Sequence, residues 1–422
     1  MREKIIFPNK TKLLLVPFKD TKAITILFLF GVGSRYERKE INGASHFIEH
    51  LMFKGTKKRP TTLDISKELD SVGAEFNAMT SKDYTGYYVK ISHDKIDLAV
   101  DILSDMLLNS KFEIAEINRE RGVIVEEINM YHDNPLMYIE SLFEETVHAG
   151  STLGWDVAGP ASVIKKVTRE QLLQYRDEYY RSDNCVIAVA GKFNDKIKNL
   201  LEQKFISKVA KARPMKKFEN FKTTQKEPRV KLQYRNTKQV QLALGFPAVG
   251  YDDPAAYALH LLTIILGGNM SSRLFISVRE RKGLAYFVRC YPNFYQDTGN
   301  IVIQSGLDIS RLDEAIGVIL NELKKVKTPG VSAKELNNAK EFLKGKMVLT
   351  LEDSSHLAEF YAKQELLQGK SMTPAEKMKK YGAVTLADIK KVANDFFRKE
   401  TLNLALIGPF KNAKKFKKLL KM

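Results

Sequence analysis

The alternation of apolar and polar positions predicts strands and helices mixed along the whole chain. Short apolar runs bounded by turn residues predict strands at 5–7, 13–18, 24–30 and 185–190, with a hairpin at 75–80 and 84–92. Apolar positions with helical spacing predict helices at 44–53, 95–108, 114–131 and 168–180. This mixture of elements is typical of an α+β fold.

The second half of the chain repeats this pattern. It begins with predicted strands at 230–234 and 240–246, and it ends with the same signature as the first half. Thr168 and Arg181 recur as Thr385 and Arg398, each 217 residues later, and the neighbouring Gly-x-Phe recurs at the same offset. The constant offset indicates an internal duplication, so we predict two tandem homologous α/β-sandwich domains.

The segment 208–228 separates the two halves. It is rich in lysine, contains Pro214 and Pro228 and shows no sustained periodicity, which is typical of an interdomain linker. The predicted boundaries are therefore 1–207 for the N-terminal domain and 229–422 for the C-terminal domain.

Composition narrows the class of protein. The chain has 422 residues, 44% of them hydrophobic, but no apolar run of membrane-spanning length and no pattern of a secretory signal. Only two cysteines are present, which excludes a disulfide framework and a cysteine-based zinc site and favours a cytoplasmic location. The net charge of +18 is spread along the chain, so we interpret it as a solvated surface and expect no nucleic-acid partner. Attraction to acidic peptides or anionic surfaces is the alternative.

The segment from Gly43 to His50 carries the clearest chemical signal. His46 and His50 are four residues apart, so on a helix they project from one face and can reach one metal ion. Glu49 lies beside that face, where it could take a proton from an attacking water. This is the H-x-x-E-H pattern of inverted zincins, although two surface histidines can share the spacing by chance.

A catalytic zinc needs a third protein ligand, and the helix predicted at 114–131 offers candidates. Glu120 and Glu127 are seven residues apart and lie nearly in line after two turns, with Val123 and Ile124 between them on roughly the same face. If that face points inward, a metal cation would explain two carboxylates there; an exposed helix face is the alternative. Glu126 points away and is expected to be solvated.

These motifs resemble the pitrilysin family, within it the mitochondrial-processing-peptidase-like branch. The stretch His-Phe-Ile-Glu-His, followed by Leu-Met-Phe-Lys-Gly-Thr, is similar to the family's zinc helix, and residues 120–127 are similar to its second glutamate helix. The resemblance implies one Zn²⁺ per chain held by His46, His50 and Glu127, with Glu49 as the general base. It also implies that Glu120 assists catalysis.

The resemblance extends to peptide binding. Residues 73–81 look like the family's substrate-binding edge strand, with Asn77 and Ala78 as the contact positions; an ordinary edge strand is the alternative. Arg279 and Tyr286 match a family Arg/Tyr pair, in which Tyr286 would stabilise the oxyanion and Arg279 would help to hold the substrate. Without the resemblance, this arginine would be a solvated helix residue and this tyrosine a core aromatic.

The motifs and the resemblance together predict a zinc-dependent endopeptidase. The resemblance implies that its two domains form a clamshell and enclose short or unfolded peptides in a chamber. The alternative is a noncatalytic peptide-binding or scaffolding subunit, and a metal hydrolase with other substrates is a third possibility. The long glycine-rich loop of the noncatalytic processing-peptidase subunit is absent here, which argues against that role. By resemblance, the chain is expected to form a homodimer or a heterodimer with a related chain.

Overall fold

The computed structural model describes residues 2–18 and 20–421, which fold into two compact units. We call them the first unit and the second unit. The first unit consists of Met1–Ile128, Asp156–Phe218 and Met347–Met372, and the second of Asn129–Trp155, Glu219–Lys346 and Thr373–Met422.

The first unit is built on a six-stranded sheet with the order β1-β2-β6-β3-β5-β4. Strands β2 and β6 are parallel and the other neighbours are antiparallel. The strands predicted in the first half of the chain lie in this sheet, which comprises β1 (Glu3–Ile6), β2 (Lys12–Pro17), β3 (Ala23–Phe30), β4 (Glu75–Thr80), β5 (Thr85–Ser92) and β6 (Cys185–Gly191).

Helices cover one face of this sheet and form the larger part of the core with it. They are α1 (Ala44–Met52), α2 (Thr62–Asp70), α3 (Ile96–Asn109), the first part of α4 (Ile114–Asp133), α6 (Ala161–Ile164), α7 (Arg169–Tyr179) and α8 (Lys196–Leu201). The predicted helices correspond to α1, α3, α4 and α7. The opposite face of the sheet packs against α12 (Ser354–Gln368), which comes from the second half of the chain.

The second unit repeats this topology with a five-stranded sheet of order β7-β11-β8-β10-β9. Its parallel pair, β7 and β11, corresponds to β2 and β6. The strands are β7 (Arg229–Tyr234), β8 (Gln239–Ala248), β9 (Ala285–Phe294), β10 (Gly299–Asp308) and β11 (Asn403–Gly408). The helices are α9 (Ala255–Gly267), α10 (Leu312–Lys327), α11 (Ala333–Thr350), α13 (Pro374–Gly382), α14 (Leu386–Phe396) and α15 (Ala413–Leu419).

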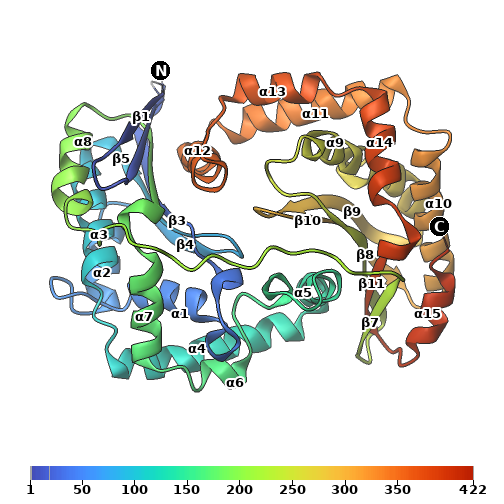
Figure 1. Cartoon of the computed structure of the whole chain (residues 1–422), viewed down its shortest axis with the longest axis horizontal. Helices are drawn as coiled ribbons and strands as arrows, with labels where there is room; N and C mark the ends of the chain where they lie inside the picture. The colour runs from blue at the N-terminus through green and yellow to red at the C-terminus, as the bar shows by residue number, and fades with distance from the viewer. Residues whose placement is uncertain (1, 19, 422) are drawn as a thin grey trace. The chain divides into compact units, whose positions relative to one another are not determined.

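Each half of the chain supplies one helix to the sheet of the other half (Figure 1). Helix α5 (Pro135–Val147) from the first half packs on β8, β10 and β11, as α12 packs on β3 and β6. Each sheet is therefore covered by helices on both faces, and every residue of β6 and of β11 is buried. The compact units therefore differ from the continuous domains 1–207 and 229–422 predicted from the sequence.

The predicted linker, 208–228, is free of helices and of strands, but it is attached to both units. Ala210 accepts a hydrogen bond from the Ser182 amide, and the Arg35 guanidinium lies 3.5 Å from the centre of the Phe218 ring. Further on, the Phe221 amide donates to Asp297. The segment is thus an extended connection with defined contacts at both ends.

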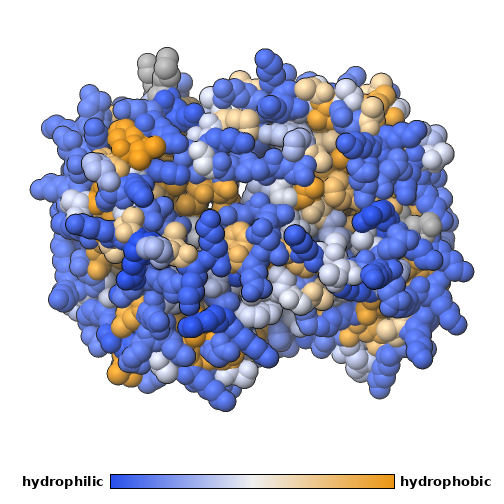
Figure 2. Space-filling view, viewed as in Figure 1, coloured by the Kyte–Doolittle hydropathy of each residue, from blue (hydrophilic) through white to orange (hydrophobic). Residues whose placement is uncertain are grey.

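The molecular surface is mainly hydrophilic, in agreement with the 28% of charged residues in the sequence. Hydrophilic side chains cover most of the face shown in Figure 2, with hydrophobic ones scattered between them. Among the residues that the structure describes, no helix has the length and apolar character needed to cross a membrane.

Candidate metal centre

Helix α1 presents its polar residues on one side only. Its N-cap, Gly43, has φ +100°, and a Cβ there would lie 2.4 Å from the Ala158 carbonyl oxygen, so the start of the helix requires glycine. Six of its nine residues are buried, and the remaining three are His46, Glu49 and His50. The sequence motif therefore forms the whole accessible face of the helix.

The two histidines of α1 converge on Glu127 of α4. The Nε2 atoms of His46 and His50 lie 3.6 and 3.5 Å from Glu127 Oε2. One ligand atom from each of the three residues lies within 4.8 Å of the others, and this is the group found among the described residues that could hold a metal ion.

The distances from the two histidine nitrogens to Glu127 Oε2 fit zinc. Bonds of about 2.0–2.2 Å at tetrahedral angles place ligand atoms roughly 3.3–3.6 Å apart, and a catalytic site has three protein ligands and one open position. Two imidazoles and one carboxylate are a donor set that zinc accepts. His46, His50 and Glu127 could therefore hold this ion without a large movement.

Glu120 lies on the far side of His50. Its Oε2 is 3.0 Å from His50 Nδ1, and its Oε1 is 2.9 Å from the Lys54 ammonium. Glu120 is 1% exposed. A carboxylate in this position fixes which ring nitrogen of His50 carries the proton and leaves Nε2 for the metal. Its side chain thus contacts a ligand-bearing residue rather than the space in front of the metal.

The charges of this group shift the two imidazoles in opposite directions. Burial and the neighbouring His50 lower the pKa of His46 to about 4. Burial also acts to lower the pKa of His50, but its hydrogen bonds to Glu120 and Glu127 raise it to about 9. The hydrogen bond with His50 holds the pKa of Glu127 below its usual range. The site thus concentrates negative charge around His50, as expected for a cation-binding position.

Glu49 is positioned by a residue that sequence reasoning missed. The Thr80 hydroxyl, at the end of β4, donates a hydrogen bond to Glu49 Oε2. Burial raises the pKa of the Glu49 carboxyl, and the hydrogen bond from Thr80 acts in the opposite direction. A carboxyl with a raised pKa suits a group that must both take and return a proton near neutral pH.

The strand β4 lies at the free edge of the first unit's sheet, as predicted for residues 73–81. Asn77 is exposed, and its side-chain oxygen accepts a hydrogen bond from the Ala78 amide. Since Thr80 of the same strand contacts Glu49, a peptide paired with β4 would run beside the Glu49 carboxyl. The peptide-binding roles of Asn77 and Ala78 stay predictions.

Both ends of α1 are held by side chains that the sequence analysis did not select. At the N-terminus, the buried Glu37 carboxylate accepts hydrogen bonds of 2.7 Å from the amides of Gly43 and Ser45. At the C-terminus, the Ser110 hydroxyl donates to the Met52 carbonyl.

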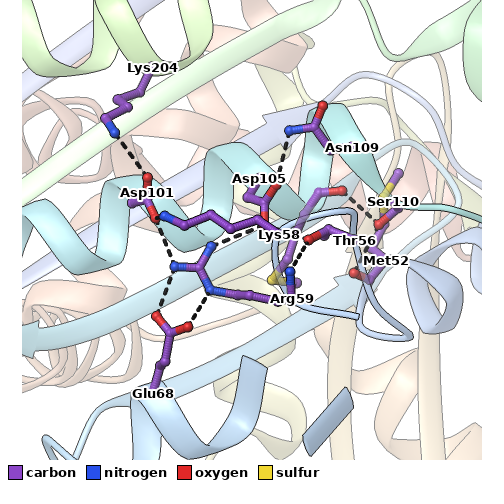
Figure 3. A network of polar contacts seen from close by, with 11 residues as sticks. Met52, Thr56, Lys58, Arg59, Glu68, Asp101, Asp105, Asn109, Ser110 and Lys204 are labelled. Atoms are coloured by element: carbon purple, nitrogen blue, oxygen red, sulfur yellow. Dashed lines mark hydrogen bonds and ion pairs between the residues drawn. The ribbon is translucent and has the colours of Figure 1, made fainter. Parts of the chain in front are cut away.

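The loop after α1 is fixed by Arg59. The Arg59 guanidinium binds three carboxylates, those of Glu68, Asp101 and Asp105, and so attaches this loop to α2 and α3 (Figure 3).

The interpretation of α4 was partly wrong. Ile124 is buried, but Val123 is 46% exposed, so the two residues do not share an inward face. Glu126 is exposed, as expected. The buried stripe of α4 runs through Glu120 and Ile124, and Glu127 lies at its edge with a quarter of its side chain accessible.

Arg279 and Tyr286 belong to the second unit. The Arg279 guanidinium, on a π-helical turn at Phe275–Glu280, lies 4.8 Å from the ring centre of Phe275 and 5.5 Å from that of Tyr286. Tyr286 is 79% exposed on the edge strand β9, so it is not a core aromatic. The structure brings these two residues together, and their participation in the site remains a prediction.

Comparison with known proteins gives a consistent result. The family model described as "Insulinase (Peptidase family M16)" matches residues 15–161, and the one described as "Peptidase M16 inactive domain" matches residues 166–343. A Bacillus subtilis (strain 168) protein named "Uncharacterized zinc protease YmxG" is 36% identical over 96% of this chain and 97% of its own length. The Dictyostelium discoideum mitochondrial-processing peptidase subunit beta is 31% identical over 90% of this chain and 83% of its own.

A solved structure shows the same fold. A Helicobacter pylori protease superimposes with a TM-score of 0.91 at 23% sequence identity, covering 97% of this chain and 99% of its own.

Proposed function

Because the chain belongs to the M16, or pitrilysin, family of peptidases, we propose that it is a zinc-dependent endopeptidase acting on short or unfolded peptides. The observation that carries the proposal is the convergence of His46 Nε2, His50 Nε2 and a Glu127 oxygen beside the Glu49 carboxyl. The relatives named zinc proteases support the choice of metal.

The residues around the site divide the chemistry between them. A zinc ion, when bound, supplies a Lewis acid that polarises the scissile carbonyl and makes water a better nucleophile near pH 7. Glu49 takes a proton from the attacking water and delivers it to the leaving amine. Thr80 keeps the Glu49 carboxylate directed towards the end of β4. Glu120 holds the His50 ring in the tautomer that leaves Nε2 available.

Substrate recognition is proposed at the edge of the first sheet. An extended peptide would add a strand to β4 at Asn77 and Ala78. Such pairing recognises the backbone of the peptide, which explains a preference for unfolded segments. We further propose that Arg279 and Tyr286 take part in substrate binding. The same proposal includes one zinc ion per chain, a cytoplasmic location and pairing with a second, identical or related chain.

Mutation of Glu49 tests the enzymatic role against the noncatalytic alternative. The zinc-loaded parent is expected to cleave a mixture of unfolded peptides, to lose activity with a chelator and to regain it with zinc. Glu49→Gln should lower kcat by roughly 10²–10⁴-fold while it still binds zinc, because the general base is removed and the ligands are not. The exposed Glu126→Gln on α4 is the control and should be as active as the parent. An inactive parent that binds zinc, or a fully active Glu49→Gln, would contradict the proposal.

A further inference from the structure

Lys54 lies at the outer end of a row of polar contacts that begins at the metal centre. Its ammonium is 2.9 Å from Glu120 Oε1, and Glu120 Oε2 is 3.0 Å from His50 Nδ1. Each oxygen of this buried carboxylate thus has its own partner. With both oxygens engaged, the plane of the carboxylate is fixed, and through it the direction of the His50 ring.

The position of Lys54 is itself fixed by the loop that follows α1. The Lys54 amide donates to the Leu51 carbonyl, and the Thr56 amide donates to the Arg59 carbonyl at 2.7 Å. The Thr56 hydroxyl donates to Asp105 at 2.6 Å, beside the guanidinium of Arg59 (Figure 3). The loop is therefore attached to α3 two residues beyond Lys54, at Thr56, and again at Arg59, which limits the places that the ammonium can reach.

The ion pair between Lys54 and Glu120 is also favoured energetically. Glu120 is 1% exposed, and a buried carboxylate is costly unless charged or polar donors satisfy it. In the first unit, Lys54 supplies the cation for Glu120, and its own side chain is 24% exposed. Without the ammonium, Oε1 would lose its partner while Oε2 still accepted from His50. The carboxylate could then turn, and the imidazole with it.

We propose that Lys54 is a positioning residue for the metal centre, which holds Glu120 so that Glu120 can hold His50 towards Glu127. The proposal rests on the proposed zinc site, but not on peptidase activity. Lys58 provides a matched comparison in the same loop, because it forms an ion pair with Asp101 and its side chain is 58% exposed. An ion pair at that place stabilises the loop without contact with Glu120.

The test is the zinc dissociation constant of the full chain, measured by chelator competition after removal and return of the metal. Lys54→Met is expected to weaken zinc binding by roughly tenfold, the lower range for changes next to a ligand, whereas Lys54→Arg stays within about threefold of the parent. Lys58→Met should bind zinc as the parent does. Lys54→Gln serves as a second variant if Lys54→Met does not fold.

The unfolding temperature of the metal-free protein separates positioning from simple stabilisation. We expect Lys54→Met to lower it, because the buried Glu120 carboxylate loses its cation, so the zinc affinities are compared at a temperature where every metal-free variant is still folded. Parental zinc affinity in Lys54→Met, or equal weakening in Lys58→Met, would overturn the proposal. Zinc binding with no peptide cleavage would refute the proposed function alone, since the affinity comparison between the variants still decides the role of Lys54.

Discussion

Helices α1 and α9 occupy corresponding places in the two units, yet they differ in what they expose. Each follows a central strand of its sheet, β3 or β8, and packs into the main core of its unit. In α1, the accessible residues are His46, Glu49 and His50. In α9, ten of thirteen residues are buried, and its one histidine, His260, contributes Nδ1 to a 2.8 Å hydrogen bond with the Tyr381 hydroxyl.

The comparison shows that the fold does not require a metal site. Burial lowers the pKa of His260 to about 4, which favours its neutral form, and its ring nitrogen is engaged by Tyr381. The duplicated architecture keeps the helix, and the polar face of three residues distinguishes the first copy. The family model that covers most of the second half carries the description "inactive domain", which agrees with this division.

The largest effect is expected from making α1 resemble α9. His50→Leu removes one metal ligand and should weaken zinc binding by more than about 100-fold, the upper range for changes that only adjust a ligand. The metal-free chain should still fold, because α9 shows that this place in the fold accepts an apolar helix. Chelator competition and circular dichroism measure the two quantities.

The control for this change is His356→Leu, which replaces an exposed histidine of α12 outside the site. It should bind zinc as the parent does. A His50→Leu protein with parental zinc affinity would show that the metal is held elsewhere.

Much of the fold was predictable because it depends on local patterns. The alternating run of β4 and β5 and the helical spacing of α1 and α3 gave element bounds within one or two residues. The 217-residue offset indicated the duplication, and both sheets confirm it. The exchange of α5 and α12 was not predictable, because an apolar helix carries no signal of which sheet it covers.

The residues of the candidate site also divide into those that a local sequence pattern predicts and those that it does not. His46, Glu49 and His50 are close in sequence, so helical periodicity was enough to place them together. Glu127 needed a resemblance, since its contact with His50 spans 77 residues. Thr80 and Glu37 were not predicted because their roles arise from hydrogen bonds to α1 that only the folded chain forms, and neither residue lies in a spaced motif. A buried acidic residue just before a helix start is a signal that could have identified Glu37.

The starts of α1 and α9 differ as well, and this predicts an intermediate effect. The buried Glu37 satisfies two amides of α1, whereas the exposed Asp253 accepts from the Ala255 amide at the start of α9. Glu37→Gln leaves a buried amide with a weaker partner or none and should lower the free energy of unfolding by roughly 1–3 kcal/mol. Asp253→Asn should lower it by less than about 1 kcal/mol. Denaturant titration of the metal-free protein compares them.

The pH dependence of the stability difference between the parent and Glu37→Gln tests whether the Glu37 carboxyl is responsible for it. Burial raises the pKa of Glu37 to about 7 from its usual 4.5, against the hydrogen bonds from Asn42, Ser45 and Gly43 that lower it. The folded chain then binds this proton more tightly than the unfolded chain, so its contribution to stability falls as pH rises from about 4.5 to about 7. The difference between parent and Glu37→Gln should shrink over that range. A difference that grows with pH would mean that Glu37 is ionised throughout.

The smallest effect concerns the hydroxyl groups that hold the polar residue of each helix. Thr80 donates to Glu49 of α1, and Tyr381 is hydrogen-bonded to His260 of α9. Thr80→Val keeps the shape of β4 but frees the Glu49 carboxylate to turn, so kcat should fall by a few-fold to about tenfold, up to roughly 1.4 kcal/mol in the barrier. KM and zinc affinity should hold, because the backbone of β4 and the three ligands are unchanged.

Thr80→Ser restores the donor and should restore kcat. Tyr381→Phe removes the corresponding hydroxyl in the second unit and should leave kcat unaltered, although it takes a hydrogen-bond partner from the partly buried His260. If Tyr381→Phe lowered kcat as much as Thr80→Val, the chemistry would not be confined to the first copy of the helix. If Thr80→Val changed KM alone, Thr80 would act on the peptide bound at β4 rather than on the general base.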